Sequence, residues 1–329
     1  GDTVTPSENL SDEPVVFIVN PHAGAGKAAR RKGDLESAIG RHFSAATIRL
    51  TEGPAHAVDL AAEAQASGAA LVVAVGGDGT CHEVVNGLCP PTSTEPASSR
   101  LGLLPFGTGS DLQRTLGMSS DLNEAMDALV KGQDRVVDVG LASFKGPTGP
   151  QRETFINVAG FGINGDVVKR ANQMDKRIGG TLTFFIATLR SSLRYVPPMV
   201  RLTWTTPEGE HTRELDVMSC FIANAEWCGG GMWVGRGGAM DDGLLNVSVL
   251  PPDPIPVQVV RTRFLYNGAL GDWPGVRQFQ TSSLKVEAID RSAPVWIDLD
   301  GEMPGQLPAE FSTHPRRLTV RASWNPKKS

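Results

Sequence analysis

Three times within residues 15–111, a short run of aliphatic residues leads into a polar loop that contains glycine. The runs span residues 15–19, 71–75 and 101–104, and the loops span residues 20–26, 76–80 and 105–111. Apolar runs of this length are typical of strands buried on both faces of a parallel sheet. Helix-like stretches, such as residues 27–43 and 55–67, alternate with them, and this alternation predicts a doubly wound α/β sheet.

The pattern changes after about residue 134, where strand-like runs follow one another with little helix between them. The runs are residues 135–144, 154–158, 200–206, 211–223, 244–250, 284–288, 295–299 and 318–322. Residues 207–209, Pro-Glu-Gly, predict a hairpin turn between two of them, and residues 181–195 predict a helix. This half of the chain therefore predicts a mainly antiparallel β domain.

The changes of pattern also give the expected domains. Residues 1–13 are polar and show no apolar period, which predicts a disordered tail. We expect an α/β domain over residues 14–133 and a β-rich domain over residues 134–329, whose last strand could pack back on the first domain. The sequence contains no internal repeat and no low-complexity tract.

The composition excludes several classes of protein. A chain with 40% hydrophobic and 20% charged residues is typical of a globular protein, and its net charge of -5 argues against binding to nucleic acid. No apolar run approaches the ~20 residues that span a membrane, and no signal-peptide pattern is present. The 4 cysteines form no CxxC pair and match no zinc spacing, so we expect a reduced, cytoplasmic enzyme.

The loop Gly76-Gly77-Asp78-Gly79-Thr80 lies between an aliphatic strand and a helix. Glycines allow backbone N–H groups to approach a phosphate closely, and the start of the helix adds a favourable dipole. A carboxylate beside a phosphate, here that of Asp78, suits a shared divalent cation or a transferable proton. The alternative is a tight strand-to-helix turn in which Asp78 caps the helix.

Similar loops at residues 20–24 and 105–111 favour a ligand site, because parallel strands place such loops along one edge of a sheet. Together the three loops predict a nucleotide cleft. Residues 24–27 match part of a Walker loop, but Pro21 and Ala28 stand where that motif has Gly and Ser or Thr. Residues 24–29 satisfy the relaxed dinucleotide fingerprint, with Glu52 as a ribose partner, so a dehydrogenase remains a minor alternative.

The motifs together resemble the diacylglycerol kinase catalytic domain, a family that includes bacterial lipid kinases and the sphingosine and ceramide kinases, with NAD kinases more distantly related. The resemblance is carried by residues 20–24 (NPHAG), 76–88 (GGDGTCHEVVNGL) and 105–111 (PFGTGSD). Asn224 and residues 229–232, 241–244 and 300–302 follow in the family's order. Ordered motifs across residues 15–322 are far more specific than any one alone. One departure is Ser110, where the family usually has Asn.

The resemblance implies where ATP binds. The implied residues are Asn20, Pro21, His22, Ala23, Gly24, Thr51, Gly76, Gly77, Asp78, Gly79, Thr80, Cys81, His82, Glu83, Gly107 and Thr108. Thr51 is also reasonable on its own terms, because it ends a short strand beside the same cleft. As an alternative, Thr51 caps the helix that follows.

Residues 295–302 end in an acidic segment that contains Asp298, Asp300 and Glu302. If one strand runs through the segment, these three side chains share a face, because strand residues alternate in direction. Like charges so close raise one another's pKa values or share a cation or proton, although the segment alone also suits a solvated strand end. The resemblance implies that Glu302 is the general base for a lipid hydroxyl and that Asp300 assists it.

The turn at residues 241–244 is a second acidic feature. The resemblance implies a structural Mg²⁺ held by the carboxylate of Asp242 and the backbone carbonyls of Ala239 and Leu244, which is reasonable for a cation that prefers oxygen ligands. The alternative is an ordinary turn with Gly243 at positive φ. A separate Mg²⁺ would bridge the ATP phosphates, with Asp78 as the nearby carboxylate.

We therefore expect an ATP-dependent lipid kinase of phospholipid biosynthesis that converts diacylglycerol to phosphatidic acid. A sphingosine- or ceramide-type kinase is the main alternative, followed by an NAD kinase and an inactive lipid-binding protein. The expected partner is a lipid at an anionic membrane surface, reached by peripheral contact without a transmembrane segment, and a homodimer is left open. Residues 167–201 contain seven basic residues and one acid, Asp175, so we predict that this segment docks on the membrane.

Overall fold

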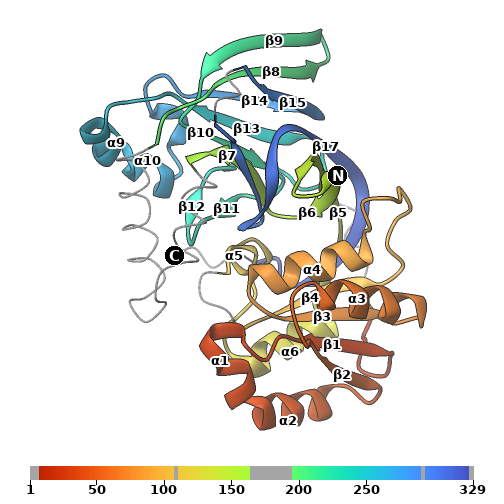
Figure 1. Ribbon diagram of the computed structural model, residues 1–329. Helices are drawn as coiled ribbons and strands as arrows, with labels where there is room; N and C mark the ends of the chain where they lie inside the picture. The colour runs from red at the N-terminus through yellow and green to blue at the C-terminus, as the bar shows by residue number, and fades with distance from the viewer. Residues whose placement is uncertain (1–6, 107–109, 164–194, 290–292, 326–329) are drawn as a thin grey trace. The chain divides into compact units, whose positions relative to one another are not determined.

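The computed structural model describes residues 7–106, 110–163, 195–289 and 293–325 (Figure 1). The chain divides into two compact units: unit 1 comprises Gly1–Asp138 and Pro315–Ser329, and unit 2 comprises Val139–His314. The predicted helix at residues 181–195 and most of the predicted docking segment at residues 167–201 lie outside the described residues.

Unit 1 is built on a parallel sheet. Its strands, in spatial order, are β2 (Ala46–Leu50), β1 (Val15–Val19), β3 (Leu71–Gly76) and β4 (Arg100–Pro105). The end of β17 (Glu302–Ala322) adds a strand beyond β4, where Val320 pairs in parallel with Leu101. Every residue of β3 is buried, as expected for a central strand with a continuous aliphatic run.

Helices cover both faces of this sheet. They are α1 (Ala23–Arg30), α2 (Lys32–His42), α3 (His56–Ala66), α4 (Asp78–Leu88), α5 (Asp111–Leu116) and α6 (Leu122–Lys131). α3 packs on α4 and α2 packs on α6, and Figure 1 shows these pairs on opposite sides of the sheet. The predicted doubly wound α/β fold is confirmed. The single helix predicted at residues 27–43 is instead two helices, because Arg31 between them has non-helical φ and ψ of -100° and 18°.

Unit 2 is mainly antiparallel, as predicted. The main sheet has the order β14, β13, β10, β7, β16, β17, and each neighbouring pair is antiparallel. β15 pairs with both β17 and β8, and β9 pairs with β8. The predicted hairpin turn at residues 207–209 is confirmed, because Thr206 pairs with Gly209 across it.

The bounds of the unit 2 strands follow from the chain order. They are β5 (Gln133–Gly146, which begins in unit 1), β6 (Gly149–Phe155), β7 (Val158–Gly162), β8 (Met199–Thr206), β9 (Gly209–Asp216), β10 (Ser219–Ala223), β11 (Trp227–Cys228), β12 (Met232–Trp233), β13 (Leu245–Leu250), β14 (Arg277–Thr281), β15 (Ser283–Ala288) and β16 (Trp296–Leu299). The single strand predicted at residues 211–223 is two strands, β9 and β10, since Val217 and Met218 donate their N–H groups to other segments.

Residues 255–272 contain helices that the sequence pattern did not indicate. These are α9 (Ile255–Arg261), α10 (Arg263–Tyr266) and the short 3₁₀ helix η2 (Leu270–Asp272). α9 and α10 are too short to show a clear helical period, which explains why a pattern of apolar residues missed them.

The apolar residues of unit 2 form two clusters on opposite faces of its main sheet. Phe161 and Ile222 belong to one cluster, whereas Val158 and Phe221 belong to the other. Because successive residues of a strand point to opposite faces, this division follows directly from the alternation along β7 and β10. The second cluster also contains Leu270 and Trp273 from the helical region, which covers that face of the sheet.

Candidate active site

The loops after β1, β3 and β4 meet at one edge of the unit 1 sheet. Gly76 pairs in register with Pro105, so β3 and β4 end level. The N–H of Asn20 donates to the carbonyl oxygen of Val75 (3.2 Å), and the N–H of Phe106 donates to that of Gly76 (3.2 Å). The parallel sheet therefore brings together the predicted nucleotide loops over the residues that the structure describes.

The first loop approaches the third more closely than a side chain would permit. Residues 24–26 have φ values of 60°, 56° and 83°, and a Cβ on Gly24 would lie 2.1 Å from the carbonyl oxygen of Phe106. Glycine at this position is thus required by both the backbone conformation and the available space. A region of such close backbone contact suits the binding of phosphate by N–H groups.

Two cations beside these loops were missed by the sequence reasoning. Lys27 Nζ lies 5.9 Å from the centroid of the Phe106 ring, and the Arg31 guanidinium carbon lies 5.5 Å from it. Their signal was the basic helix-like stretch that follows the first loop. Arg31 is paired with Asp34 (3.4 Å), so the two cations leave one uncompensated positive charge at this edge, which favours an anionic ligand.

The carboxylate of Asp78 links the loop after β3 to the start of α5. Its Oδ2 accepts a hydrogen bond from the N–H of Asp111 (3.0 Å), and its Oδ1 accepts from the N–H of Leu112 (3.4 Å) and the hydroxyl of Ser110 (3.4 Å). The alternative that Asp78 caps its own helix is wrong, because α4 has Gly77 at its cap position and no side-chain cap. Asp78 instead caps α5, which fixes the position of its carboxylate.

Thr51 lies where the sequence placed it, next to the end of β1. Its N–H donates to the carbonyl oxygen of Val19 (2.9 Å), and the residue is half-buried. The alternative role of Thr51 as a helix cap is wrong, since Ala55 occupies the cap position of α3. Gly107 and Thr108 lie outside the described residues.

The predicted residues of α4 differ in their surroundings. Thr80, Cys81 and His82 are buried, and the side-chain amide of Asn86 donates to the carbonyl oxygen of His82 (2.9 Å). Gly79 and Glu83 are half-buried. The first turn of α4 therefore combines a partly accessible edge with a buried packing face.

In unit 2, the acidic segment is a hairpin. β16 ends at Leu299, β17 begins at Glu302, and these two residues pair. Asp300 and Gly301 between them have φ values of 52° and 87°, which is the requirement of a type I′ turn. The expectation that one strand continues through Glu302 is therefore wrong, because the Asp-Gly pair reverses the chain. Glu302 is exposed, whereas Asp300 is buried.

Asp300 is held by the backbone at the start of β7. Its Oδ2 accepts from the N–H of Ile156 (3.1 Å) and its Oδ1 from the N–H of Asn157 (2.8 Å). The side-chain amide of Asn224 in turn donates to the carbonyl oxygen of Ile156 (2.7 Å). Sequence reasoning missed Asn157, although a polar residue within an aliphatic run was a signal. These hydrogen bonds fix the orientation of the Asp300 carboxylate.

Asp298, two residues earlier, is in a different environment. Its side chain is 9% exposed, and its Oδ2 has no hydrogen-bond partner among the described residues. Burial, and then the charge of Asp300, raise the pKa of Asp298 to about 7. A carboxyl group whose pKa is strongly perturbed by burial and by a neighbouring charge marks a candidate functional site.

The predicted magnesium loop is a tight turn in unit 2. The N–H of Leu244 donates to Oδ1 of Asp242 (3.0 Å), and Gly243 between them has a φ of 70°. Ala239 and Asp242 are exposed. Over the residues that the structure describes, no group of three His, Cys, Asp or Glu side chains could hold a metal ion. Asp242 with two carbonyl groups would be a different kind of site, and it stays a prediction.

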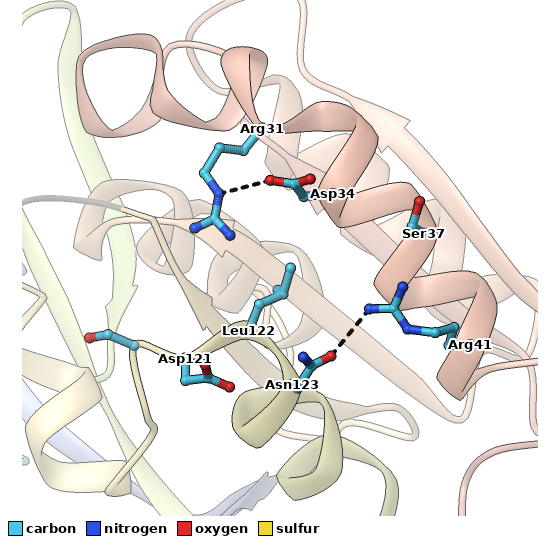
Figure 2. Close-up of a pocket in the computed structure, with 8 residues that line it drawn as sticks. Arg31, Asp34, Ser37, Arg41, Asp121, Leu122 and Asn123 are labelled. Carbon is cyan, nitrogen blue, oxygen red and sulfur yellow. Dashed lines mark hydrogen bonds and ion pairs between the residues drawn. The ribbon is translucent and has the colours of Figure 1, made fainter.

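A polar cavity of about 480 Å³ lies between α2 and the start of α6 (Figure 2). Arg31 bonds to Asp34 (3.4 Å) and Arg41 to Asn123 (3.2 Å) along its wall. Arg31, which also lies beside the third nucleotide loop, lines this cavity, but none of the residues predicted for catalysis, nucleotide or metal does.

Comparison with known proteins places this arrangement in a family. Residues 14–142 match the diacylglycerol kinase catalytic domain, and residues 157–322 match the YegS C-terminal NAD kinase beta sandwich-like domain. The chain is 30% identical over 253 residues to a Chromohalobacter salexigens protein described as a probable lipid kinase, YegS-like, with 76% of this chain and 74% of that protein covered. It is 28% identical over 311 residues to a diacylglycerol kinase of Mycobacterium tuberculosis, with 93% and 94% covered.

A solved structure shares the fold of this chain. The crystal structure of a diacylglycerol kinase from Bacillus anthracis str. Sterne superposes with a TM-score of 0.72 at 23% identity, covering 94% of this chain and 97% of that one. The chain belongs to the diacylglycerol kinase catalytic-domain family. It is a lipid kinase, and membership of a kinase family implies the use of ATP. None of the helices among the described residues is long and apolar enough to span a membrane.

Proposed function

We propose that this protein transfers the γ-phosphate of ATP to the free hydroxyl of diacylglycerol and so forms phosphatidic acid for phospholipid biosynthesis. The observation that carries the proposal is the carboxylate of Asp300, fixed by the N–H groups of Ile156 and Asn157 within the turn that leads to Glu302. A fixed carboxylate beside an exposed one is what a proton acceptor and its positioning partner require. Relatives named as diacylglycerol kinases support the choice of lipid.

The proposed nucleotide site is formed by unit 1. Residues 20–24, 51 and 76–83 would contact ATP, together with residues 107 and 108. Their backbone N–H groups would hold the phosphates, and Lys27 and Arg31 support an anionic ligand there. Phosphoryl transfer depends mainly on positioning and electrostatic stabilisation, so backbone N–H donors are sufficient for the part that unit 1 plays in the reaction.

The proposed chemistry of unit 2 is proton removal. Glu302 accepts the proton of the lipid hydroxyl. At the same time the hydroxyl oxygen bonds to the γ-phosphorus of ATP, and the bond between the γ-phosphorus and the departing ADP breaks. Asp300 positions the turn that carries Glu302 and adds negative charge beside it. Glu302 is exposed, which allows a substrate to reach it.

The proposal includes two Mg²⁺ ions, one bound with ATP and one at the turn that contains Asp242. The ion bound with ATP would spread the phosphate charge, and the fixed carboxylate of Asp78 fits a cation beside the phosphates. A second Mg²⁺ would be held by Asp242 and the carbonyls of Ala239 and Leu244, where the hydrogen bond from Leu244 to Asp242 already shapes the turn. The second ion would order the loop and take no part in transfer.

We place the enzyme in the cytoplasm, in peripheral contact with an anionic membrane that contains its lipid, and expect no nucleic-acid partner. A homodimer is compatible with this proposal, and sedimentation velocity of the purified protein would decide it. The net charge of -5 requires that any attraction to such a membrane be local to one surface.

The test is an assay with radiolabelled ATP and Mg²⁺ against a panel of diacylglycerol, sphingosine, ceramide and NAD, each lipid dispersed in detergent. We expect labelled phosphatidic acid as the main product. A higher rate on sphingosine or ceramide would replace diacylglycerol with a sphingoid substrate. Label in NADP alone would overturn the lipid proposal.

A further inference from the structure

The exposed face of α9 and α10 is unusually apolar. Among the described residues, large hydrophobic side chains that are strongly exposed gather there: Val259 is 50% exposed, Val260 is 64% and Tyr266 is 42%. Neither helix contains a buried residue. Single exposed hydrophobic residues are ordinary, but several on one short helical pair indicate an interaction surface.

Hydrogen bonds and apolar packing attach this surface to the rest of unit 2. Asp253 Oδ2 accepts hydrogen bonds from Arg261 (2.6 Å) and from the indole N–H of Trp273 (2.8 Å). Phe264 and Leu265 of α10 pack against the apolar cluster that contains Trp273. The exposed apolar side chains therefore belong to helices that are packed against unit 2.

Two exposed arginines lie around the surface. Arg263 is exposed, and its guanidinium carbon lies 5.0 Å from the centroid of the Phe264 ring. Arg236 is exposed as well, lies 4.9 Å from the centroid of the Trp233 ring and donates to the carbonyl oxygen of Gly268 (3.2 Å). Asp253 is paired with Arg261, and Asp272 of η2, which contacts α10, is exposed, so the two exposed arginines leave this surface with a small positive charge on a protein whose net charge is -5.

The surface is connected within unit 2 to Asp300, the residue that positions Glu302. α10 contacts β12, and Met232 of β12 belongs to the same apolar cluster as Val158. The carbonyl oxygen of Val158 accepts a hydrogen bond from the N–H of Asp300 (3.0 Å). α10 and β12 thus pack on the face of the sheet that carries Val158, next to which Asp300 is held, and α9 contacts α10 (Figure 1).

We propose that the exposed face of α9 and α10 docks on an anionic lipid bilayer, with Val259, Val260 and Tyr266 entering the headgroup boundary and Arg263 and Arg236 contacting lipid phosphates. Exposed aliphatic residues, an aromatic residue with a polar tip and arginines are the composition of interfacial helices. Charge complementarity with anionic lipids selects a bilayer over a neutral apolar partner. This inference rests on the proposed function, because a kinase of a bilayer lipid must reach its substrate there, and it names a surface different from residues 167–201.

The experiment measures sedimentation of the full chain with vesicles of phosphatidylglycerol and, separately, of phosphatidylcholine, without ATP. The variant Val259→Ser/Val260→Ser removes the apolar contact, and Arg263→Glu reverses the charge. Two matched controls change exposed residues elsewhere in unit 2: Ile289→Ser, at a side chain 41% exposed, and Arg213→Glu on β9.

We expect Arg263→Glu to lower the partition onto phosphatidylglycerol vesicles by about tenfold and Val259→Ser/Val260→Ser to lower it by about a hundredfold, since the double variant removes four methyl groups whereas the reversal affects a single charged residue. The effect of Arg263→Glu should shrink at high salt, and both controls should bind as the wild type does. Wild-type binding by both test variants would overturn the proposal. A change from dimer to monomer in Val259→Ser/Val260→Ser, with vesicle binding retained, would instead assign the surface to a second copy of this chain.

Activity in detergent separates this proposal from the proposed function. The test variants should phosphorylate a short-chain diacylglycerol dispersed in detergent at the wild-type rate, because docking is not needed there. If the wild type forms no phosphatidic acid in detergent but binds vesicles through Val259 and Val260, the proposed substrate fails and the docking surface stands.

Discussion

The two units each fix a carboxylate with backbone N–H groups, but they do so over very different distances along the chain. In unit 1, Asp78 accepts from Asp111 and Leu112, which belong to the next strand-and-loop segment at the same sheet edge. In unit 2, Asp300 accepts from Ile156 and Asn157, which lie 144 and 143 positions away. The parallel sheet of unit 1 forms its site from neighbouring loops, whereas the antiparallel sheet of unit 2 forms it from segments that are far apart in the sequence.

The largest expected effect tests whether unit 1 binds the nucleotide while unit 2 removes the proton. Glu302→Gln removes the proposed proton acceptor and keeps the volume, so turnover should fall by about 10²–10⁴-fold. Binding of Mg²⁺-ATP, measured by calorimetry, should be unchanged because unit 1 supplies that site. The matched control is Glu310→Gln, at another exposed carboxylate of β17. Turnover in Glu302→Gln equal to that of Glu310→Gln would show that Glu302 is not the base.

The second prediction concerns the other buried carboxyl group of unit 2. Because the pKa of Asp298 is raised from 3.8 to about 7, the folded protein holds a proton that the unfolded chain loses as the pH rises above about 4. Asp298 therefore makes its full contribution to the free energy of unfolding below about pH 4. This contribution falls as the pH rises and levels off above about pH 7, so that it decreases by about 4 kcal/mol in total.

Asp298→Asn has no such proton, so the stability of the variant relative to the wild type should increase between pH 4 and pH 8. Urea denaturation at several pH values measures this slope, which a constant offset from the substitution does not affect. Adding Asp300→Asn to both proteins should reduce the slope, because the charge of Asp300 contributes to the shift. Parallel pH profiles for wild type and Asp298→Asn would mean that Asp298 is ionised in the folded state.

These contrasts explain how much could be predicted from the sequence. Aliphatic runs and glycine loops are local signals, so the doubly wound sheet and the meeting of the loops at Gly76 and Asn20 followed from them. The reversal at Asp300 was also local, since Asp-Gly is a strong hairpin signal, but strict alternation through residues 295–302 obscured it. The contact of Asp300 with Asn157 depends on the register of β16 and β7, and no local pattern encodes that register.

The third prediction tests close backbone approach in unit 1. A Cβ at Gly24 would lie 2.1 Å from the Phe106 carbonyl oxygen, whereas a Cβ at Gly40 in α2 meets nothing within 4 Å. Gly24→Ala should destabilise the protein by about 1–3 kcal/mol and weaken ATP binding at least about tenfold, because the loops must separate. Gly40→Ala should be neutral or stabilising by up to about 1 kcal/mol. Equal thermal stability and ATP affinity in the two variants would contradict a tight contact between the loops.

The smallest expected effect separates a structural cap from a ligand in unit 1. Asp78 caps α5, and Asp121 caps α6 by accepting from the N–H of Glu124 (2.9 Å). Replacing either with Asn should cost a similar stability, about 1 kcal/mol or less, since Asn remains a good capping residue.

ATP binding should distinguish these two variants. Asp78→Asn removes a negative charge that the proposal assigns to the cation beside the phosphates, so the affinity for Mg²⁺-ATP should fall while the affinity for ATP in EDTA should hold or improve. Asp121→Asn should leave both affinities unchanged, because none of the proposed nucleotide residues contacts that cap among the hydrogen bonds of the described chain. Isothermal titration with and without Mg²⁺ measures the difference. If Asp78→Asn binds Mg²⁺-ATP as tightly as Asp121→Asn does, the carboxylate of Asp78 is a helix cap alone, and unit 1 holds the nucleotide without it.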